Sequence, residues 1–124
     1  MKRDILDRLE TFIDLDKSLS EAKKELLLYT IEHLLRLGIE PTFPYIAVGA
    51  CKMFPQAFSL SADFNDVPDT RVVDQTLASL KEEITLSPQQ TYRLTPLGKN
   101  IVLDVSTRLR NKAANKSEPE TKTI

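Results

Sequence analysis

The hydrophobic period of this chain changes within residues 69–97, and that change limits the folds the chain can adopt. Asp69 is a good helix N-cap, and apolar side chains then recur at helical spacing on one face of residues 69–83. From Ile84 onward apolar and polar residues alternate, which is the period of a β-strand. The polar sequence SPQQ at 87–90 separates two such alternating runs. This stretch therefore predicts one helix followed by an antiparallel hairpin.

A last helix is expected directly after the hairpin. Pro96 ends the second strand because proline has no N–H to donate to the ladder, and a helical pattern starts there. Its expected buried face consists of Leu97, Ile101, Val102, Val105 and Leu109. Residues 110–124 carry no periodic apolar positions, and we expect them to form a disordered polar tail.

Three more helices are expected in the first half of the chain. Residues 4–16 carry a narrow apolar stripe, and residues 44–54 begin with a proline that suits a first helical turn. Residues 21–37 are apolar over more than half of the helix circumference, so this helix must be buried on two sides. Gly38 ends it. Residues 39–43 are too short and too interrupted by proline to form a helix.

The order helix, hairpin, helix resembles the second half of a winged helix-turn-helix domain. The sequence TYRLTPLGKNI at 91–101 looks like the wing and exit strand of that family, where an aromatic-Xaa-Leu-Thr-Xaa-Xaa-Gly run is common. The resemblance covers residues 19–109. It implies a mostly α fold with a small antiparallel β-hairpin as the wing and a short first strand at 39–43. The helix expected at 4–16 would be an extra N-terminal helix before this domain. It also implies a module that binds nucleic acid or a partner protein.

This resemblance gives three expected regions. Residues 1–17 form the N-terminal helix, which either packs on the domain or pairs two subunits as a dimerisation element. Residues 18–109 form the winged-helix domain, and residues 110–124 form the tail.

The chain departs from the family between residues 55 and 68. A helix-turn-helix joins its helices by three or four residues, whereas fourteen residues stand here. Phe58, Leu60, Phe64 and Val67 predict that this insertion is pinned to the core. It is equally a candidate binding loop.

Composition favours a single domain of ordinary globular character, with 124 residues of which 41% are hydrophobic and 28% charged. The net charge of −1 argues against coating nucleic acid by bulk electrostatics. Two cations stand against four carboxylates in residues 69–83, but seven cations against three carboxylates in residues 84–124. Positive potential is therefore expected at the hairpin and the last helix, and not at the helix before them.

Neither a membrane span nor a disulfide framework is expected. No apolar run approaches the roughly 20 residues that a transmembrane helix needs. The single cysteine, Cys51, fits a reducing compartment, and we expect it to be buried and structural rather than reactive. The N-terminus is too charged for a secretory signal. These features predict a cytoplasmic protein.

Catalytic chemistry is not expected. His33 is the single histidine and has no ligand at metal-binding spacing, so a metal site or a catalytic triad is not expected. Three glycines, at 38, 49 and 98, cannot make a phosphate-binding loop. We therefore expect neither an enzyme nor a bound metal or cofactor.

The first functional hypothesis is a homodimeric transcriptional regulator that binds double-stranded DNA and pairs through its N-terminal helices. Helix 69–83 would enter the major groove by its N-terminal half. Candidate base contacts are Thr70, Arg71, Asp74, Gln75 and Ser79, and candidate phosphate contacts are Gln89, Gln90, Arg93 and Lys99. The alternative is a protein-interaction module, acting as a subunit or adaptor in a larger complex, because the candidate recognition helix is acidic.

Overall fold

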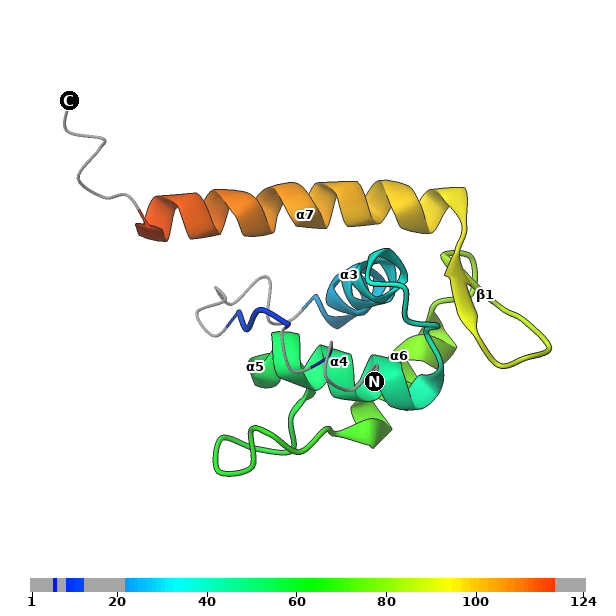
Figure 1. Ribbon diagram of the computed structural model, residues 1–124, viewed down its shortest axis with the longest axis horizontal. Coiled ribbons are helices and arrows are strands. Elements are labelled where there is room, and N and C mark those ends of the chain that lie inside the picture. Colours follow the sequence, from blue (N-terminus) through cyan, green and yellow to red (C-terminus); the bar gives the residue numbers. More distant parts are fainter. Residues whose placement is uncertain (1–5, 7–8, 13–21, 118–124) are drawn as a thin grey trace.

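The computed structural model describes residues 6, 9–12 and 22–117, with side chains up to residue 110. The described elements are α3 (Lys23–Arg36), α4 (Phe43–Met53), α5 (Pro55–Phe58), α6 (Thr70–Ser79), β1 (Ile84–Leu86), β2 (Tyr92–Leu94) and α7 (Pro96–Ser117) (Figure 1). The fold is mostly α with one small antiparallel hairpin, which confirms the predicted fold class at this level. None of the described helices combines the length and the apolar character needed to cross a lipid bilayer.

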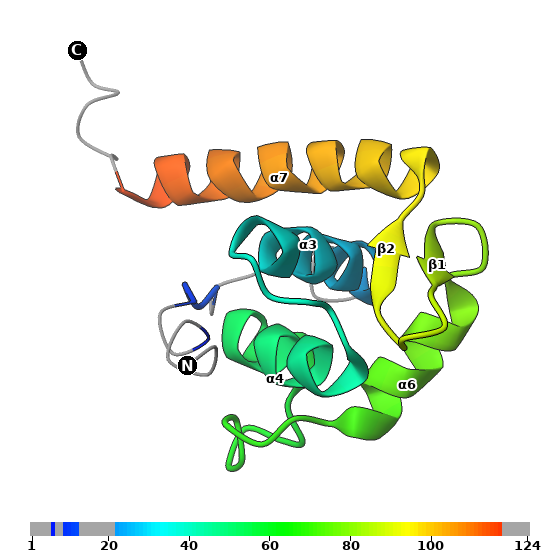
Figure 2. The same cartoon turned by 45° about the vertical axis from the view of Figure 1, so that its right-hand side comes forward.

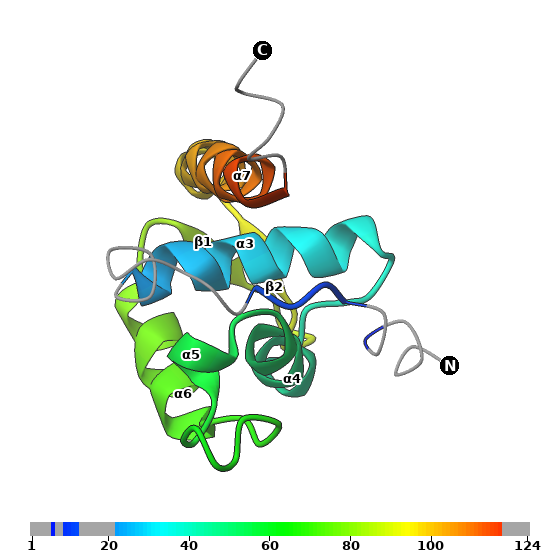
Figure 3. The same ribbon diagram turned by 90° about the vertical axis from the view of Figure 1, so that its left-hand side faces the viewer.

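Helix α3 is the centre of the core. Figure 3 shows α7 lying across one side of α3 and α4, α5 and α6 gathered on the other. Its fully buried side chains are Leu26, Leu27, Leu28, Thr30, Ile31 and Leu34. The prediction that this helix is buried on two sides is confirmed, and α7 supplies the second cover. Gly38 follows the helix with a φ of +78°, a conformation that glycine adopts without a Cβ penalty.

The predicted hairpin is present. Ile84 pairs with Leu94 and Leu86 with Tyr92 in an antiparallel register. The chain reverses at the predicted turn, where the N–H of Ser87 donates to the carbonyl oxygen of Thr91 at 3.0 Å. The apolar pair Ile84 and Leu94 is buried, but Leu86 nearer the tip is 49% exposed. The hairpin is thus anchored at its base and projects at its tip.

The predicted short strand at 39–43 is wrong. Residues 39–42 form no strand, and α4 already begins at Phe43. The segment still lies beside the hairpin, because the carbonyl oxygen of Pro41 accepts the N–H of Tyr92 at 2.9 Å. Proline has no N–H to return, so the ladder cannot extend to a third strand.

The predicted helix at 4–16 is wrong for residues 9–12, which are not helical. The N–H of Phe12 donates to the carbonyl oxygen of Met53 at 2.7 Å, and Thr11 Oγ1 donates to that of Lys52 at 2.9 Å. These bonds satisfy carbonyl groups at the end of α4 that have no partner within the helix. Most of the remaining predicted helix, and with it most of the expected dimerisation element 1–17, lies outside the described residues.

The described part of the N-terminal stripe packs on its own domain. Leu6 and Leu9 are buried. The ring of Phe12 stacks on Phe54 with 5.3 Å between centroids and meets Tyr29 edge to face. The side chains of Leu6, Leu9 and Phe12 therefore pack against the core of their own chain.

The insertion at 55–68 is only partly pinned to the core. It begins with the short helix α5, and Phe58 is fully buried as predicted. The prediction is wrong for Leu60, Phe64 and Val67, which are 55%, 58% and 36% exposed. After Phe58 the chain leaves the core and returns only at α6.

Helix α7 also differs from the expectation at both ends. Leu97 was expected to be buried and is 44% exposed, whereas Val102, Val105 and Leu109 face α3 as predicted. The predicted disordered tail is wrong for residues 110–117, which continue the helix. That stretch is rich in Lys, Arg and Ala, and adding such residues to an existing helix needs no new nucleation. Residues 118–124 lie outside the described residues.

The Leu-Thr-Xaa-Xaa-Gly run marks the joint between the hairpin and α7. Thr95 caps the helix by accepting the N–H of Gly98 on its Oγ1 at 3.2 Å. The same hydroxyl donates to the carbonyl oxygen of Glu82 at 2.7 Å. Gly98 lies so close to the carbonyl oxygen of Glu83 that a Cβ would collide with it. This joint holds the start of α7 against the residues that enter β1.

Candidate nucleic-acid interface

Helix α6 turns one face to the core and the other to solvent. Asp69 caps it by accepting the N–H of Val72 at 3.3 Å, as predicted, and the helix ends at Ser79, four residues before the expected end at 83. Val73, Thr76 and Leu77 are buried. The five candidate base contacts, Thr70, Arg71, Asp74, Gln75 and Ser79, are all exposed. The helix therefore presents a polar face of the kind a groove-binding helix needs.

The exposed face of α6 divides into two parts. Gln75 and Ser79 line an open groove of about 460 Å³ between α6 and the first turn of α3, together with Lys23 and Lys24. Arg71 does not line this groove. The two lysines were missed by the sequence reasoning. Their position beside α6 depends on how α3 crosses that helix, which the sequence does not reveal. The only local signal for these residues is a pair of lysines at the start of a predicted helix.

The hairpin lies next to α6. Burial raises the pKa of the Tyr92 phenol on β2, and the negative charge of Asp74 on α6 raises it further, so the two side chains are electrostatic neighbours. Figure 2 shows β1 beside the end of α6 and the loop that precedes α6 at the opposite end of that helix. The hairpin thus adjoins α6, and Asp74 is the member of the polar face whose charge acts on it.

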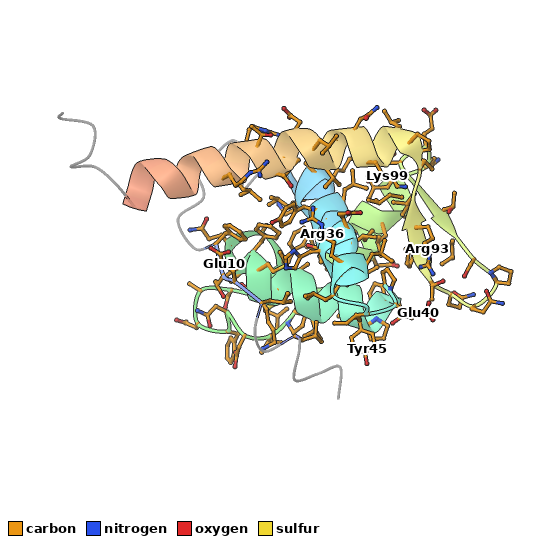
Figure 4. The ribbon with its side chains drawn as sticks, turned by 45° about the horizontal axis from the view of Figure 1, so that its top comes forward. Glu10, Arg36, Glu40, Tyr45, Arg93 and Lys99 are labelled. Atoms are coloured by element: carbon orange, nitrogen blue, oxygen red, sulfur yellow. The ribbon has the colours of Figure 1, made fainter. Side chains whose placement is uncertain are left out.

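The candidate phosphate contacts are exposed, but one of them is already paired. Gln89 and Gln90 are exposed at the hairpin tip, and Gln90 has a φ of +67°. Arg93 lies 3.3 Å from Glu40 in the segment before α4, whereas Lys99 is exposed in the first turn of α7. Figure 4 shows Arg93, Glu40 and Lys99 at the same end of the molecule. The sequence reasoning could not see the Arg93–Glu40 pair because its members are 53 positions apart.

Charge around α6 is mixed. Four carboxylates, those of Asp69, Asp74, Glu82 and Glu83, belong to α6, its cap and the turn after it, where Arg71 and Lys81 are the cations. Asp63 and Asp66 are exposed in the loop just before the helix. The first turn of α3 adds Lys23, Lys24 and Glu25 to the lining of the groove beside α6. These residues carry one net positive charge, which offsets only a small part of the acidity of α6.

Neither His33 nor Cys51 belongs to this interface. The His33 ring stacks on Tyr29 with 5.8 Å between centroids, and burial together with the charge of Arg36 lowers its pKa. Cys51 is buried on α4, its Sγ donates to the carbonyl oxygen of Asn65 at 3.4 Å, and burial raises the pKa of the thiol. Among the residues the structure describes, no group of three or more His, Cys, Asp or Glu side chains is placed to hold a metal ion.

No protein-family model, curated protein or solved structure significantly matches this chain.

Proposed function

We propose that this protein is a winged helix-turn-helix protein that binds double-stranded DNA, with α6 as the recognition helix and the β1–β2 hairpin as the wing. The order α3, α4, α6, hairpin and α7 supports this assignment, with the 55–68 insertion standing between the second and third helices. The observation that carries the proposal is the polar face of α6. Its side chains Thr70, Arg71, Asp74, Gln75 and Ser79 are exposed on the side of the molecule that also bears the hairpin.

In this proposal the first two turns of α6 enter the major groove. Arg71 has the geometry to read guanine and Gln75 to read adenine, whereas Asp74 is suited to accept from the amino group of cytosine. Lys99, Gln89 and Gln90 would contact phosphates, which fix the register of the protein without reading sequence.

The proposed biological role is that of a homodimeric transcriptional regulator in the cytoplasm. Two-fold dimers are the commonest soluble oligomers, and paired subunits would read two half-sites about one helical turn apart. Because Phe12 is part of the core, the full-length chain is the species to examine. Sedimentation of the full chain over a range of concentrations tests pairing, and a monomer mass at the highest concentration contradicts it.

Titration of a random-sequence duplex at several salt concentrations tests DNA binding itself. Affinity should fall steeply between about 50 and 200 mM salt, and Lys99→Ala should reduce the salt slope by about one charge. Arg36→Ala is the control, because Arg36 is an exposed cation on α3 that pairs with Glu32 and lies outside the proposed DNA interface. Absence of binding even at low salt would remove the proposal.

Selection of preferred duplexes tests the role of α6. Arg71→Ala should cost about 1–3 kcal/mol at a selected site and relax the preference at one position. An unchanged preference would mean that α6 does not read the bases.

A second candidate function is a protein-interaction module, a subunit or adaptor in a larger complex. The carboxylates on and beside α6 favour it, because Asp69, Asp74 and Glu82 would repel phosphates but would suit a basic partner. If the folded chain binds no DNA at any of the salt concentrations, this second function is favoured.

A further inference from the structure

The loop at residues 59–68 presents three large apolar side chains to solvent. Leu60, Phe64 and Val67 are 55%, 58% and 36% exposed within eight consecutive positions. Single exposed apolar residues are normal on protein surfaces, but a cluster of them marks a site of interaction. We call Leu60, Phe64 and Val67, with the exposed carboxylates of Asp63 and Asp66 between them, the loop surface.

The loop is held in shape by its own hydrogen bonds. An isolated antiparallel bridge between Ser59 and Pro68 closes it. The N–H of Leu60 donates across the loop to the carbonyl oxygen of Val67 at 3.0 Å. Two local turns lie within it, with the N–H of Phe64 donating to Ser61 (3.1 Å) and that of Val67 to Phe64 (3.2 Å). The Cys51 thiol donates to the carbonyl oxygen of Asn65, which ties the loop tip to α4. A preformed surface of this kind loses little conformational freedom on binding.

The charge of the segment is of one sign. Between positions 53 and 70 the sequence contains Asp63, Asp66 and Asp69 but neither Lys nor Arg. An acidic protein surface would be repelled by the exposed carboxylates of the loop surface. The complementary ligand is apolar and cationic.

A pocket lies beside the loop surface. Its volume is about 260 Å³ and its lining is mixed, with polar and charged side chains of both signs beside apolar ones: Leu9, Thr11, Cys51, Lys52, Pro55, Asn65 and Asp66. It offers room for a side chain of a partner to insert between the loop and the end of α4. Buried anchors of this type carry most of the free energy of a typical protein interface.

We propose that the loop surface is a docking site for a partner protein that presents an amphipathic helix with large apolar residues beside Lys or Arg. The loop surface adjoins the N-terminal end of α6, whereas the hairpin lies at the opposite end of that helix (Figure 2). The docking site therefore borders the proposed recognition helix and is distant from the proposed wing.

Synthetic amphipathic peptides are the probe, titrated against the full isotope-labelled chain and followed by amide chemical shifts. A helical peptide of Leu and Lys should bind and shift the amides of residues 59–68 and of Cys51. A Leu/Glu peptide should not bind, because its charge is wrong, and a Ser/Lys peptide should not bind, because it lacks apolar anchors. Equal binding of the three peptides, or shifts confined to α6 and the hairpin, would overturn the proposal.

Two variants test the chemistry of the site. Phe64→Ser should weaken the Leu/Lys peptide by about tenfold or more. Asp63→Lys combined with Asp66→Lys should reverse the preference in favour of the Leu/Glu peptide. Leu103→Ser, at a leucine of α7 that is 66% exposed, is the control and should leave peptide affinity unchanged.

The remaining outcomes are also decisive. All four side chains changed in these three variants are exposed, so an unaltered urea midpoint is expected and shows that each variant is folded. If the full chain self-associates and Phe64→Ser abolishes that association, the occupant is a second copy and the proposed partner is wrong. If the Leu/Lys peptide binds while duplex DNA does not, the docking proposal stands and the DNA proposal fails.

Discussion

Arg93 on β2 and Glu40 before α4 form an ion pair of 3.3 Å that joins the hairpin to the segment between α3 and α4. The Arg93 and Glu40 side chains are 46% and 65% exposed, so the pair contributes little to stability, about 0–1 kcal/mol. Its larger effect is on charge. The carboxylate neutralises an arginine that the proposed interface would use against phosphate.

Removing that carboxylate should strengthen DNA binding. Glu40→Gln keeps the side-chain shape and leaves Arg93 unpaired, so affinity for duplex DNA should rise by roughly two- to fivefold at low salt, with a steeper salt slope. Glu32→Gln is the matched control, because it also removes one carboxylate from an exposed arginine pair, that with Arg36 on α3. An equal rise in both variants would mean that only net charge changed.

Gly98 should be intolerant of any side chain. A Cβ at this position would collide with the carbonyl oxygen of Glu83, which belongs to the backbone and cannot turn aside. Gly98→Ala should therefore lower the free energy of unfolding by about 1–3 kcal/mol, although alanine is the better helix former. Urea denaturation measures the change. Asn100→Ala, at an exposed position of the same helix, should shift stability by less than about 0.5 kcal/mol.

Stability should fall with mild acid because of His33. Burial lowers the pKa of its imidazole below the ordinary 6.5, so the folded chain holds fewer protons than the unfolded chain just below that pH. The free energy of unfolding should therefore decrease as the pH falls from about 7 through 6.5 toward the lowered pKa. His33→Gln should flatten this part of the profile, since the chain has one histidine. Identical urea midpoints of both proteins across this range would contradict the assignment.

Cys51 should react slowly in the native protein. Its side chain is buried, and burial and the charge of Asp66 raise its pKa, which lowers the thiolate fraction. Iodoacetamide at neutral pH should modify it at least about 100-fold more slowly than in concentrated urea. Free glutathione under both conditions corrects for the effect of urea on the reagent. If Cys51 in the native protein reacts with iodoacetamide as fast as free glutathione does, its thiol is exposed and the prediction is wrong.

Strong local patterns were sufficient to predict α3, α4, α6 and the hairpin. The cap at Asp69, the glycine at 38 and the switch of period at Ile84 each act within a few residues of where they stand, so sequence alone reveals them. The exposed face of α6 follows from the same periodicity. The start of α7 is likewise signalled by Pro96.

Contacts distant in sequence account for what sequence could not predict. Residues 9–12 read as helix but complete hydrogen bonds at the end of α4, about forty positions away. Leu60, Phe64 and Val67 read as anchors, yet the bridge from Ser59 to Pro68 turns them outward. The hydrophobicity of such residues predicts that they are buried. It does not tell whether they are buried within their own chain or against a partner.

Asp69 serves both the loop and α6. Its N–H donates to the carbonyl oxygen of Phe58 at 2.8 Å, where the loop leaves the core, and its carboxylate caps the first turn of the helix. A displacement of the loop therefore strains the two hydrogen bonds of Asp69. If the bond to Val72 breaks, the first turn of α6 loses its cap. Through Asp69 the loop is thus linked by hydrogen bonds to the first turn of the helix that faces solvent.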